Sequence, residues 1–435
     1  MHHFQYRQGE LCAEDVPVAR IVEQVGTPVY LYSLATLRRH YRVFDEAFAR
    51  IKHLVCFSIK ANSNLAVLRT FVCEGSGFDV VSGGELFRAL KAGADPRKIV
   101  FSGVGKSREE IAYALAQNIL MFNVESAQEL DTINAVAANL GKKAPVSLRV
   151  NPDVDPKTHP YISTGMKKSK FGIDIKRSLD EYERARALPN VNVIGVDCHI
   201  GSQLTMTSPF IDALARVKEL IFRLRERGFV INYLDFGGGL GITYNDENPP
   251  EPKEYAGSLI EMMGALATPS TGAATPDTDL TLVLEPGRVI VGNAGILVTR
   301  VLYLKNNGEK NFVVVDSGMN DLIRPALYGS YQGIQPVRQT TEKTFVADVV
   351  GPVCESGDFF AKDREVTAFA PGELMAVMSA GAYGFVMASN YNTRPRPAEV
   401  LVDGADFFVV RERETLDDLI RGEQIPATLQ LSDKS

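Results

Sequence analysis

Between about residue 54 and residue 285, short apolar runs alternate with longer amphipathic stretches, and this alternation constrains the fold more than any other feature. Such a pattern is typical of βα units around a parallel sheet. The candidate strands are Leu54–Ser58, Phe78–Val81, Ile99–Ser102, Ile119–Val124, Val146–Val150, Val193–His199, Ile231–Phe236 and Leu280–Glu285. Helical stretches between them include Arg108–Gln117, Ala127–Leu140 and Pro209–Arg227. This number of units predicts an α/β fold with a closed (β/α)8 barrel rather than an open doubly wound sheet.

The sequence after Glu285 predicts a second, all-β domain of the sandwich or barrel-like type. Its apolar runs, separated by Gly, Pro, Asp and Asn turns, are Ile296–Leu304, Phe312–Val315, Thr344–Val350, Leu374–Met378 and Phe407–Arg411. We assign Pro28–Tyr32 to the same domain, which gives a barrel over residues 33–284 and a β domain over residues 1–32 plus 285–435. The small, polar stretch Ala267–Thr278 predicts a mobile loop before the eighth barrel strand.

Charge and cysteine usage exclude several classes of protein. Lys and Arg number 47 against 53 Asp and Glu, and this mildly acidic balance argues against nucleic-acid binding. The cysteines are odd in number and show no CxxC spacing, so we expect neither a disulfide framework nor a metal site. No apolar run reaches the roughly 18 residues of a membrane span, and the N-terminus does not resemble a signal peptide. We therefore expect a cytoplasmic protein without a membrane partner.

The predicted strands end in polar or glycine-rich residues, as expected for a barrel enzyme whose working groups lie at the carboxyl ends of the strands. These ends are Ser58–Asn62, Asp79 with Ser82–Gly84, Ser102–Gly103, Asn123, Arg149–Asn151, His199–Ser202, Asp235–Gly239 and Glu285–Arg288. Polar residues at so many strand ends favour an enzyme over a purely structural or interaction protein.

Two of these ends have a specific chemical interpretation and a simpler alternative. Lys60 follows a strongly apolar run, where partial desolvation would lower its pKa and make it an amine nucleophile; otherwise it is a solvated rim lysine. The glycines Gly237, Gly238 and Gly239 let backbone N–H groups converge on an anion such as a phosphate, or form only a flexible turn. Their spacing matches neither a Walker motif nor a dinucleotide fingerprint.

Three further residues are candidates with open roles. His199 could be a ligand, a base, a ring-stacking partner or merely a satisfied polar residue. Glu285 ends an apolar strand and needs a cationic partner, either Arg288 or a protonated heterocycle. Cys354 lies beside Glu355 in a Gly-flanked loop, where it is either inert packing or a proton donor.

Taken in order, the motifs resemble the fold-type III decarboxylases that use pyridoxal 5′-phosphate, over nearly the whole chain. The motifs are Phe57–Asn62, Phe78–Leu86, His199–Gln203, Asp235–Gly239, Glu285–Arg288, Arg324–Tyr328, Gly351–Asp358 and Gly381–Gly384. The stretch between Asn151 and Gly172, with His159-Pro160-Tyr161, also resembles the family's loop.

The resemblance implies how the cofactor is bound. Lys60 would hold it covalently, His199 would stack on the ring, and Glu285 would keep the pyridine nitrogen protonated. A carboxylate and a protonated ring nitrogen at ~4 Å interact by ~4 kcal/mol at an effective dielectric near 20, enough to keep the proton near neutral pH. The remaining cofactor-binding residues expected are Asp79, Ser202, Gly237, Gly238, Gly239, Gly287, Arg288 and Tyr383.

The resemblance also implies a substrate, meso-2,6-diaminopimelate, which would give L-lysine and carbon dioxide in the last step of lysine biosynthesis. Arginines pair bidentately with carboxylates, so Arg288, Arg324, Tyr328 and Tyr383 would bind the non-reacting end. Glu355 would receive the distal ammonium, and Cys354 would reprotonate the α-carbon. In relatives a partner subunit contributes the loop with Cys354, so we expect a homodimer with shared active sites.

Two other functions remain open at this point. A sibling decarboxylase acting on carboxynorspermidine, ornithine or arginine would share Lys60, His199, Gly237 and Glu285, although Arg324 and Glu355 favour a dicarboxylic diamino acid. A non-catalytic pyridoxal phosphate regulator would be expected to lack Lys60 or Cys354, and both are present.

Overall fold

The computed structural model describes residues 2–155, 170–266, 279–339 and 343–429. The predicted loop Ala267–Thr278 and the stretch His159–Tyr161 lie outside these ranges. The described part of the chain contains no helix with the length and apolar content needed to cross a bilayer.

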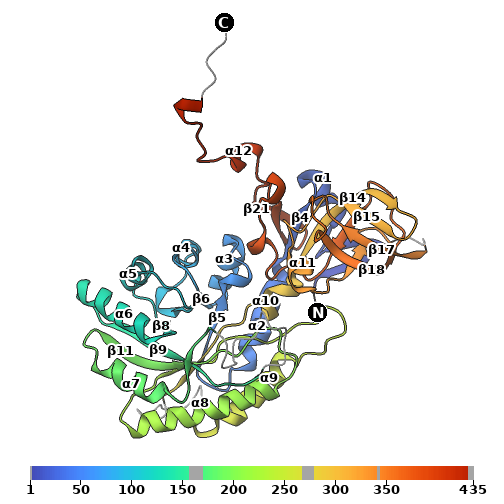
Figure 1. Cartoon of the computed structure of the whole chain (residues 1–435). Coiled ribbons are helices and arrows are strands. Elements are labelled where there is room, and N and C mark those ends of the chain that lie inside the picture. Colours follow the sequence, from blue (N-terminus) through green and yellow to red (C-terminus); the bar gives the residue numbers. More distant parts are fainter. Residues whose placement is uncertain (1, 156–169, 267–278, 340–342, 430–435) are drawn as a thin grey trace.

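A closed parallel barrel forms the larger part of the molecule, which confirms the predicted α/β fold (Figure 1). Each strand pairs in parallel with its neighbours, and the last pairs with the first through Leu282 opposite His53. All the predicted barrel strands are present, with bounds that differ by a few residues. They are β5 (His53–Ser58), β6 (Gly77–Val80), β7 (Ile99–Phe101), β8 (Met121–Val124), β9 (Ala144–Asn151), β11 (Val191–Asp197), β12 (Tyr233–Asp235) and β13 (Thr281–Leu284). The short β10 (Ile173–Asp174) pairs with the end of β9.

Helices surround the barrel, and local sequence signals fix where several of them begin. Ser107 and Glu110 form a capping box at the start of α5, and Ser82 caps α4. Prolines stand in the first turn of α8 and α9, where the missing N–H has no intrahelical partner. The helices are α2 (Leu34–Ala47), α3 (Leu65–Cys73), α4 (Gly83–Lys91), α5 (Arg108–Gln117), α6 (Ala127–Asn139), α7 (Ser178–Ala187), α8 (Ser208–Glu226), α9 (Pro252–Met263) and α10 (Arg288–Val291).

The barrel strands carry large apolar residues along most of their length and polar residues near their carboxyl ends. Phe57, Phe78, Phe101 and Phe122 are fully buried and belong to one continuous core cluster. Burial of an aromatic side chain of this size stabilises the fold by roughly 2 kcal/mol or more. Asp79, Asn123, Ser147, Asp197 and Asp235 are also buried, and hydrogen bonds or ion pairs connect most of them. The rigid strands therefore position a polar cluster at one end of the barrel.

A second, β-rich domain packs beside the barrel, as predicted (Figure 1). Its main sheet has the order β18-β17-β15-β14-β4-β20-β21, and β19 joins β14 to β16. The strands are β4 (Val29–Ser33), β14 (Gly295–Asn306), β15 (Asn311–Val315), β16 (Ile334–Pro336), β17 (Thr344–Val350), β18 (Phe359–Thr367), β19 (Leu374–Val377), β20 (Ala398–Asp403) and β21 (Asp406–Arg411). The sequence patterns did not predict β16, β18 and β20.

The N-terminal segment belongs to this second domain. β4 lies between β14 and β20 in the sheet, so Val29–Ser33 contributes one of its strands. A small antiparallel sheet and one helix precede it: β1 (Phe4–Arg7), β2 (Glu10–Ala13), β3 (Val16–Pro17) and α1 (Val18–Val25). Because β4 ends at Ser33 and β13 ends at Leu284, we propose domain boundaries at residues 33 and 284.

Candidate active site

One cavity of about 510 Å³, including its open mouth, lies at the carboxyl end of the barrel beside the β domain. It brings together most of the cofactor-binding residues predicted from the sequence. The cavity is lined by Phe44, Ser58, Lys60, His199, Ser202, Gly238, Gly239, Leu240, Tyr255, Glu285, Pro286, Gly287, Arg288 and Tyr383. Tyr383 comes from the β domain, and its backbone N–H donates to the carbonyl of Ala61, so the two domains meet at this cavity.

Lys60 lies on a short 3₁₀ turn directly after β5, and Asp79 at the end of the neighbouring β6 faces it. The Lys60 Nζ is 2.8 Å from Asp79 Oδ2, and the Ser58 hydroxyl donates to the same oxygen. Burial lowers the pKa of Lys60, but the charges of Asp79 and Glu285 outweigh it and hold that pKa well above its ordinary value. The predicted lowering of the pKa is therefore wrong for the protein alone, because the adjacent strand supplies a counter-ion.

Glu285 is buried at the end of β13, where its carboxylate makes weak hydrogen bonds and contacts no cation in the described part of the chain. Its Oε1 accepts from the Ser102 hydroxyl at 3.2 Å and from the Asn123 amide at 3.4 Å. Burial and the neighbouring carboxylates of Asp235 and Asp79 raise its pKa well above the usual range. Arg288, the structural partner considered from the sequence, instead donates to Tyr244 and Ser202. Glu285 is thus left to pair with a group inside the cavity.

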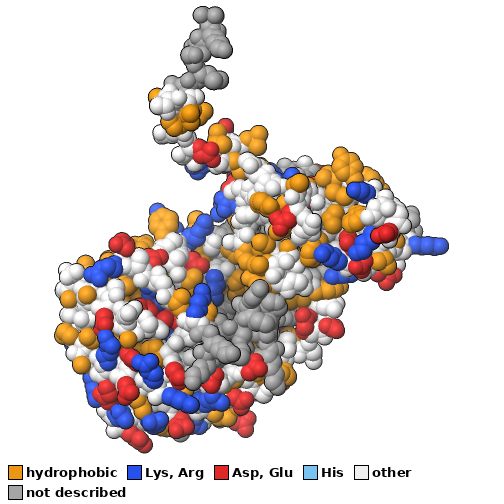
Figure 2. Space-filling view, viewed as in Figure 1, with side chains coloured by type: hydrophobic (Ala, Val, Ile, Leu, Met, Phe, Trp, Pro, Cys, Tyr) orange, Lys and Arg blue, Asp and Glu red, His pale blue; other side chains and the backbone are white. Residues whose placement is uncertain are grey.

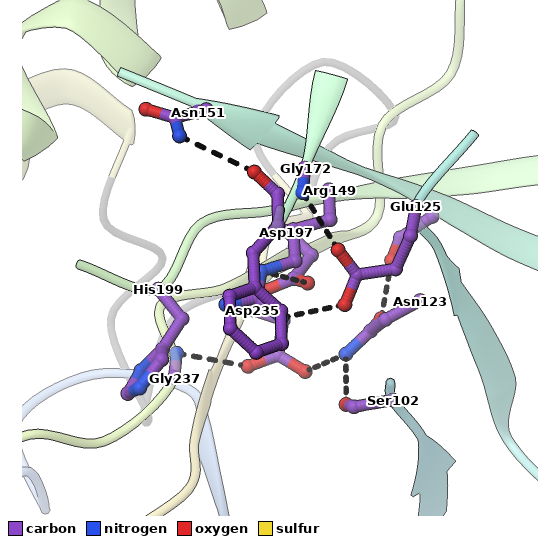
Figure 3. A network of polar contacts seen from close by, with 12 residues as sticks. Ser102, Asn123, Glu125, Arg149, Asn151, Gly172, Asp197, His199, Asp235 and Gly237 are labelled. Carbon is purple, nitrogen blue, oxygen red and sulfur yellow. Dashed lines mark hydrogen bonds and ion pairs between the residues drawn. The ribbon is translucent and has the colours of Figure 1, made fainter. Parts of the chain in front are cut away.

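A hydrogen-bond network beneath the cavity links the strand ends to the glycine loop (Figure 3). The Asn123 amide donates to Asp235 Oδ2 at 2.9 Å and to the Ser102 hydroxyl at 3.0 Å. Asp235 Oδ1 accepts the backbone N–H of Gly237 at 3.0 Å. Burial, with the charge of Asp197 adding to it, raises the pKa of Asp235 to about 7. Asn123 and Asp235 therefore fix the position where the chain turns into the glycines.

A buried ion pair lies at the edge of the same network (Figure 3). Arg149 Nη1 is 2.6 Å from Glu125 Oε1, and the backbone N–H of Gly172 donates to the other oxygen of Glu125. Arg149 also lies 3.9 Å from Asp197, whose pKa is raised by burial despite this cation. The pair ties the ends of β8 and β9 to the chain at residue 172, and it does not line the cavity.

Neighbouring atoms leave no space for a Cβ at the three glycine positions after β12. A Cβ added at Gly237, which has φ +65°, would lie 2.5 Å from the His199 ring. At Gly238 it would lie 2.2 Å from the carbonyl oxygen of Glu285, and at Gly239 it would lie 2.6 Å from that of Gly201. Real Cβ atoms do not approach so closely, so only glycine fits these positions. Gly238 and Gly239 reach the cavity, whereas Gly237 lies behind His199.

His199 presents a neutral ring to the cavity. Burial lowers its pKa well below the usual range, and the charges of Arg149 and Lys60 add to that effect. The Gly238 N–H donates to Nδ1 at 3.2 Å, which places the ring proton on Nε2. A neutral imidazole fixed in this way suits a stacking contact with a flat ring.

Two buried arginines gather at one side of the cavity among tyrosine rings. Arg288 donates from Nη1 to the Tyr244 hydroxyl at 2.7 Å and from Nη2 to the Ser202 hydroxyl at 3.1 Å. Arg324 is 7% exposed and lies over the rings of Tyr244, Tyr328 and Tyr383 at 5.4, 5.5 and 5.9 Å. Among the described residues, Arg324 has neither a hydrogen-bond acceptor nor an ion-pair partner.

Cys354 and Glu355 lie apart from the cavity, in the loop that joins β17 to β18. Cys354 is an exposed free thiol, and its backbone N–H donates to Asn392. Asp358 fixes the loop by accepting the backbone N–H groups of Met319 and Val353 at 2.6 and 2.7 Å. Neither Cys354 nor Glu355 is among the residues that line the cavity.

The sequence interpretation missed Tyr244, which joins both arginines. The residue follows the glycines in the run Gly239-Leu240-Gly241-Ile242-Thr243-Tyr244, so an aromatic residue directly after a ligand-binding turn was the available signal. It also left Asn123 and Arg149 without a role, although both had been noted at strand ends.

Residues 34–292 match the family model described as the pyridoxal binding domain of pyridoxal-dependent decarboxylases, and the chain belongs to this family. It is 54% identical to diaminopimelate decarboxylase from Pseudomonas aeruginosa, over 98% of this chain and 99% of that one. Among solved structures, the diaminopimelate decarboxylase of Helicobacter pylori complexed with L-lysine is 43% identical, with a TM-score of 0.87 and coverage of 93% and 98%. That of M. jannaschii with L-lysine is 39% identical, with a TM-score of 0.92 and coverage of 99% and 100%. These comparisons confirm the resemblance.

Proposed function

We propose that the chain catalyses the decarboxylation of meso-2,6-diaminopimelate to L-lysine and carbon dioxide, with pyridoxal 5′-phosphate as cofactor. Relatives named diaminopimelate decarboxylase, which are about half identical to this chain over the full length, support the activity. In the structure, the observation that carries it is Arg324, a buried guanidinium beside the cavity that holds Lys60, which has no anionic partner among the described residues. A buried cation of this kind needs an anion, and the non-reacting carboxylate of the substrate supplies one.

The cavity residues fit the cofactor. Lys60 provides an amine, and Glu285 provides a buried carboxylate that pairs with no cation from the residues the structure describes. The backbone at Gly238 and Gly239 leaves no room for a Cβ, which suits a close approach to a phosphate. When bound, pyridoxal 5′-phosphate supplies an aldehyde for an amine and an electron-withdrawing pyridine ring.

We propose the following roles for the residues that would bind the cofactor. Lys60 would hold the cofactor through its amine, and Asp79 would keep that lysine as a cation when it is released. Glu285 would accept a hydrogen bond from the protonated ring nitrogen, and that contact would lower its raised pKa towards the ionised form. His199 would cover one face of the ring and exclude water from it. The phosphate would be surrounded by Gly238, Gly239, Ser202, Gly287 and Tyr383, and Gly237, which lies behind His199, would fix the turn that precedes them.

We propose that Arg288, Arg324, Tyr328 and Tyr383 bind the distal carboxylate. Arg324 has its donors free of hydrogen bonds to described residues, and Arg288 adds a second positive charge. Ornithine and arginine lack a second carboxylate, so they would leave two buried cations without an anion. This difference favours the dicarboxylic substrate over the monocarboxylic ones.

The site requires a second copy of the chain. We propose a homodimer in which the partner subunit brings its loop with Cys354 and Glu355 to this cavity. Cys354 would then give a proton to the α-carbon after carbon dioxide leaves, and Glu355 would receive the distal ammonium. The exposure of Cys354 and the rigid backbone of its loop support this arrangement.

We propose the cytoplasm as the location of the protein. The cysteines Cys12, Cys56, Cys73, Cys198 and Cys354 are all free thiols in the structure. Free thiols persist in reducing compartments, which supports this location.

The test of the function is a substrate panel. Purified protein loaded with pyridoxal 5′-phosphate is given meso-diaminopimelate, ornithine, arginine or carboxynorspermidine, and both carbon dioxide and the amine product are measured. We expect L-lysine from diaminopimelate and at least about 100-fold lower kcat/KM for the substrates without a second carboxylate. A preference for another substrate would contradict the interpretation of the arginine group. Cofactor binding without turnover of any substrate would favour the alternative function, a non-catalytic pyridoxal phosphate regulator.

A further inference from the structure

Tyr244 is carried by a loop whose backbone is fixed from within. The backbone N–H groups of Tyr244 and Asn245 both donate to Glu247 Oε2, at 2.9 and 2.8 Å. The Thr243 hydroxyl donates to the Glu247 carbonyl at 2.8 Å and closes the turn. Burial of Glu247 raises its pKa, but these N–H groups outweigh that effect and lower it, so the carboxylate stays ionised. The turn therefore holds Tyr244 in one place.

A second set of contacts fixes this loop to the loop that follows β11. The Gln203 side chain donates to the Ile242 carbonyl at 2.7 Å and accepts the Ile242 N–H at 3.2 Å. A parallel bridge joins Leu204 to Leu240 beside it. Because Ser202 belongs to the same loop as Gln203, Tyr244 and Ser202 are held at a fixed separation. Both hydroxyls accept a hydrogen bond from one guanidinium, that of Arg288.

The Tyr244 ring lies next to both buried guanidiniums. The guanidinium carbons of Arg288 and Arg324 are 5.8 and 5.4 Å from its centroid. Burial lowers the pKa of Arg324, and the charge of Arg288 adds to this, so the pair is unfavourable without compensation. An aromatic face attracts cations, and a hydroxyl that accepts from Arg288 stabilises that charge directly. Tyr244 thus keeps two like charges close together.

We propose that Tyr244 is a specificity-determining residue, which holds Arg288 beside Arg324 so that both guanidiniums face the distal carboxylate of the substrate. The inference depends on the function proposed above. Arg288 donates hydrogen bonds to the hydroxyls of Tyr244 and Ser202, whereas the side chain of Arg324 donates none to described residues. Arg324 therefore makes the bidentate contact with the carboxylate, and Arg288 contributes a positioned charge. Loss of Tyr244 releases Arg288 from this position.

Binding of two diamines, L-lysine and cadaverine, distinguishes this role of Tyr244 from a general effect on the site. L-lysine keeps the distal carboxylate of meso-diaminopimelate, whereas cadaverine has an amine at both ends and no carboxylate. Their dissociation constants are measured by calorimetry on the protein loaded with pyridoxal 5′-phosphate. The variants are Tyr244→Phe, which removes only the hydroxyl, and Tyr244→Leu, which also removes the ring. Tyr113→Phe, on the outer helix α5, is the matched control.

We expect Tyr244→Phe to weaken L-lysine binding about 10-fold and Tyr244→Leu about 100-fold, with cadaverine binding unchanged. The KM for diaminopimelate should rise in parallel while kcat stays within about twofold. The visible absorbance of the bound cofactor should not change, since Tyr244 does not line the cofactor cavity.

Each other outcome has a definite meaning. If the native protein prefers L-lysine and both variants keep that preference, the role of Tyr244 is wrong and the proposed function stands. If the native protein binds both diamines equally, the distal pocket of the proposed function is wrong, and this inference fails with it. Should Tyr244→Leu fail to fold, Tyr244→Phe decides, because it removes a single oxygen atom.

Discussion

The candidate catalytic residues lie in two regions, the barrel cavity and the loop from Cys354 to Asp358. The regions differ in how much of the active site a single chain supplies. At the cavity, Lys60 and Glu285 follow two barrel strands, Asp79 lies behind Lys60 on a third, and hydrogen bonds connect them to one another or to the network beneath them. In the loop, the backbone is tightly held while the thiol of Cys354 faces solvent. The cavity is assembled by one chain, whereas the loop presents an exposed thiol that, in the proposed function, acts on the cavity of a second copy.

Electrostatics explains why the two regions are built differently. Several carboxylates buried in a small volume are unfavourable unless cations and hydrogen-bond donors compensate them, so their positions are fixed by the barrel itself. A thiol needs no counter-ion and tolerates exposure until a partner surface covers it. Replacing residues in each region therefore tests whether the cavity is needed for cofactor binding and the loop for proton transfer.

The largest effect is expected at Lys60. Lys60→Arg keeps a cation for Asp79 but cannot form the covalent link, so the visible absorbance of the bound cofactor should disappear and activity should fall at least about 1,000-fold. Lys60→Ala, which removes the cation as well, should have the same result. Lys91→Ala on α4 is the control. A bound chromophore that persists in both Lys60 variants would contradict the role.

A smaller and more selective effect is expected at Cys354. Cys354→Ala should lower kcat about 100- to 1,000-fold, because a proton donor is lost, while the absorbance of the bound cofactor stays unchanged. Cys73, the other exposed thiol, lies on α3 and gives the control Cys73→Ala. Unchanged turnover in Cys354→Ala would remove it as the proton donor and with it the contrast between the two regions.

The two variants together test whether the site is shared. When Lys60→Arg and Cys354→Ala chains are co-expressed, half of the dimers are mixed, and each mixed dimer holds one site with both native residues. About a quarter of the native activity should therefore return if the sites are shared across a two-fold axis. Activity no higher than that of the single variants, in a preparation shown to contain mixed dimers, would contradict the homodimer with shared sites.

The last expected effect is on stability rather than on activity, and it lies at Asp235. Its pKa in the folded protein, about 7, lies above the ordinary 3.8, so the folded state retains a proton that the unfolded chain loses. Stability from this group is present below about pH 4 and is lost as the pH rises to about 7, by up to about 4 kcal/mol. Asp235→Asn should remove this dependence in cofactor-free protein.

Denaturant unfolding between pH 4.5 and 8 measures the effect. The free energy of unfolding of Asp235→Asn, relative to the native protein, should increase with pH. Asp358→Asn extends the comparison to the loop, because burial raises the pKa of Asp358 as well and the same direction is expected. A difference between Asp235→Asn and the native protein that stays constant with pH would contradict the raised pKa.

Repeating patterns made the barrel predictable, and their absence explains what was missed. The barrel strands are buried on both faces and read as apolar runs, so all of them were found. β18, with the sequence FFAKDREVT, carries charged residues that are mostly exposed, and its pattern is therefore weak. The pKa of Lys60 was predicted in the wrong direction because Asp79, 19 residues away, becomes a neighbour only when β5 and β6 pair.

The candidate site was predictable where it coincided with strand ends. Lys60, His199, Gly238, Gly239 and Glu285 all follow barrel strands, and all line the cavity. Tyr244 lies in a loop beyond a strand end, and its importance comes from contacts with two arginines that are distant in sequence. Such contacts have no local pattern.

The position of β4 in the middle of the second sheet has a consequence for protein synthesis. All five residues of β4 are buried in the finished structure, between β14 and β20. Both neighbours are translated after residues 34–294, which at about 5 to 20 residues per second takes roughly 15 to 50 s. During that time the strand leaves the ribosome with two open edges, while the barrel behind it can already close. The nascent chain must therefore keep an apolar segment soluble until its C-terminal half arrives to complete the sheet.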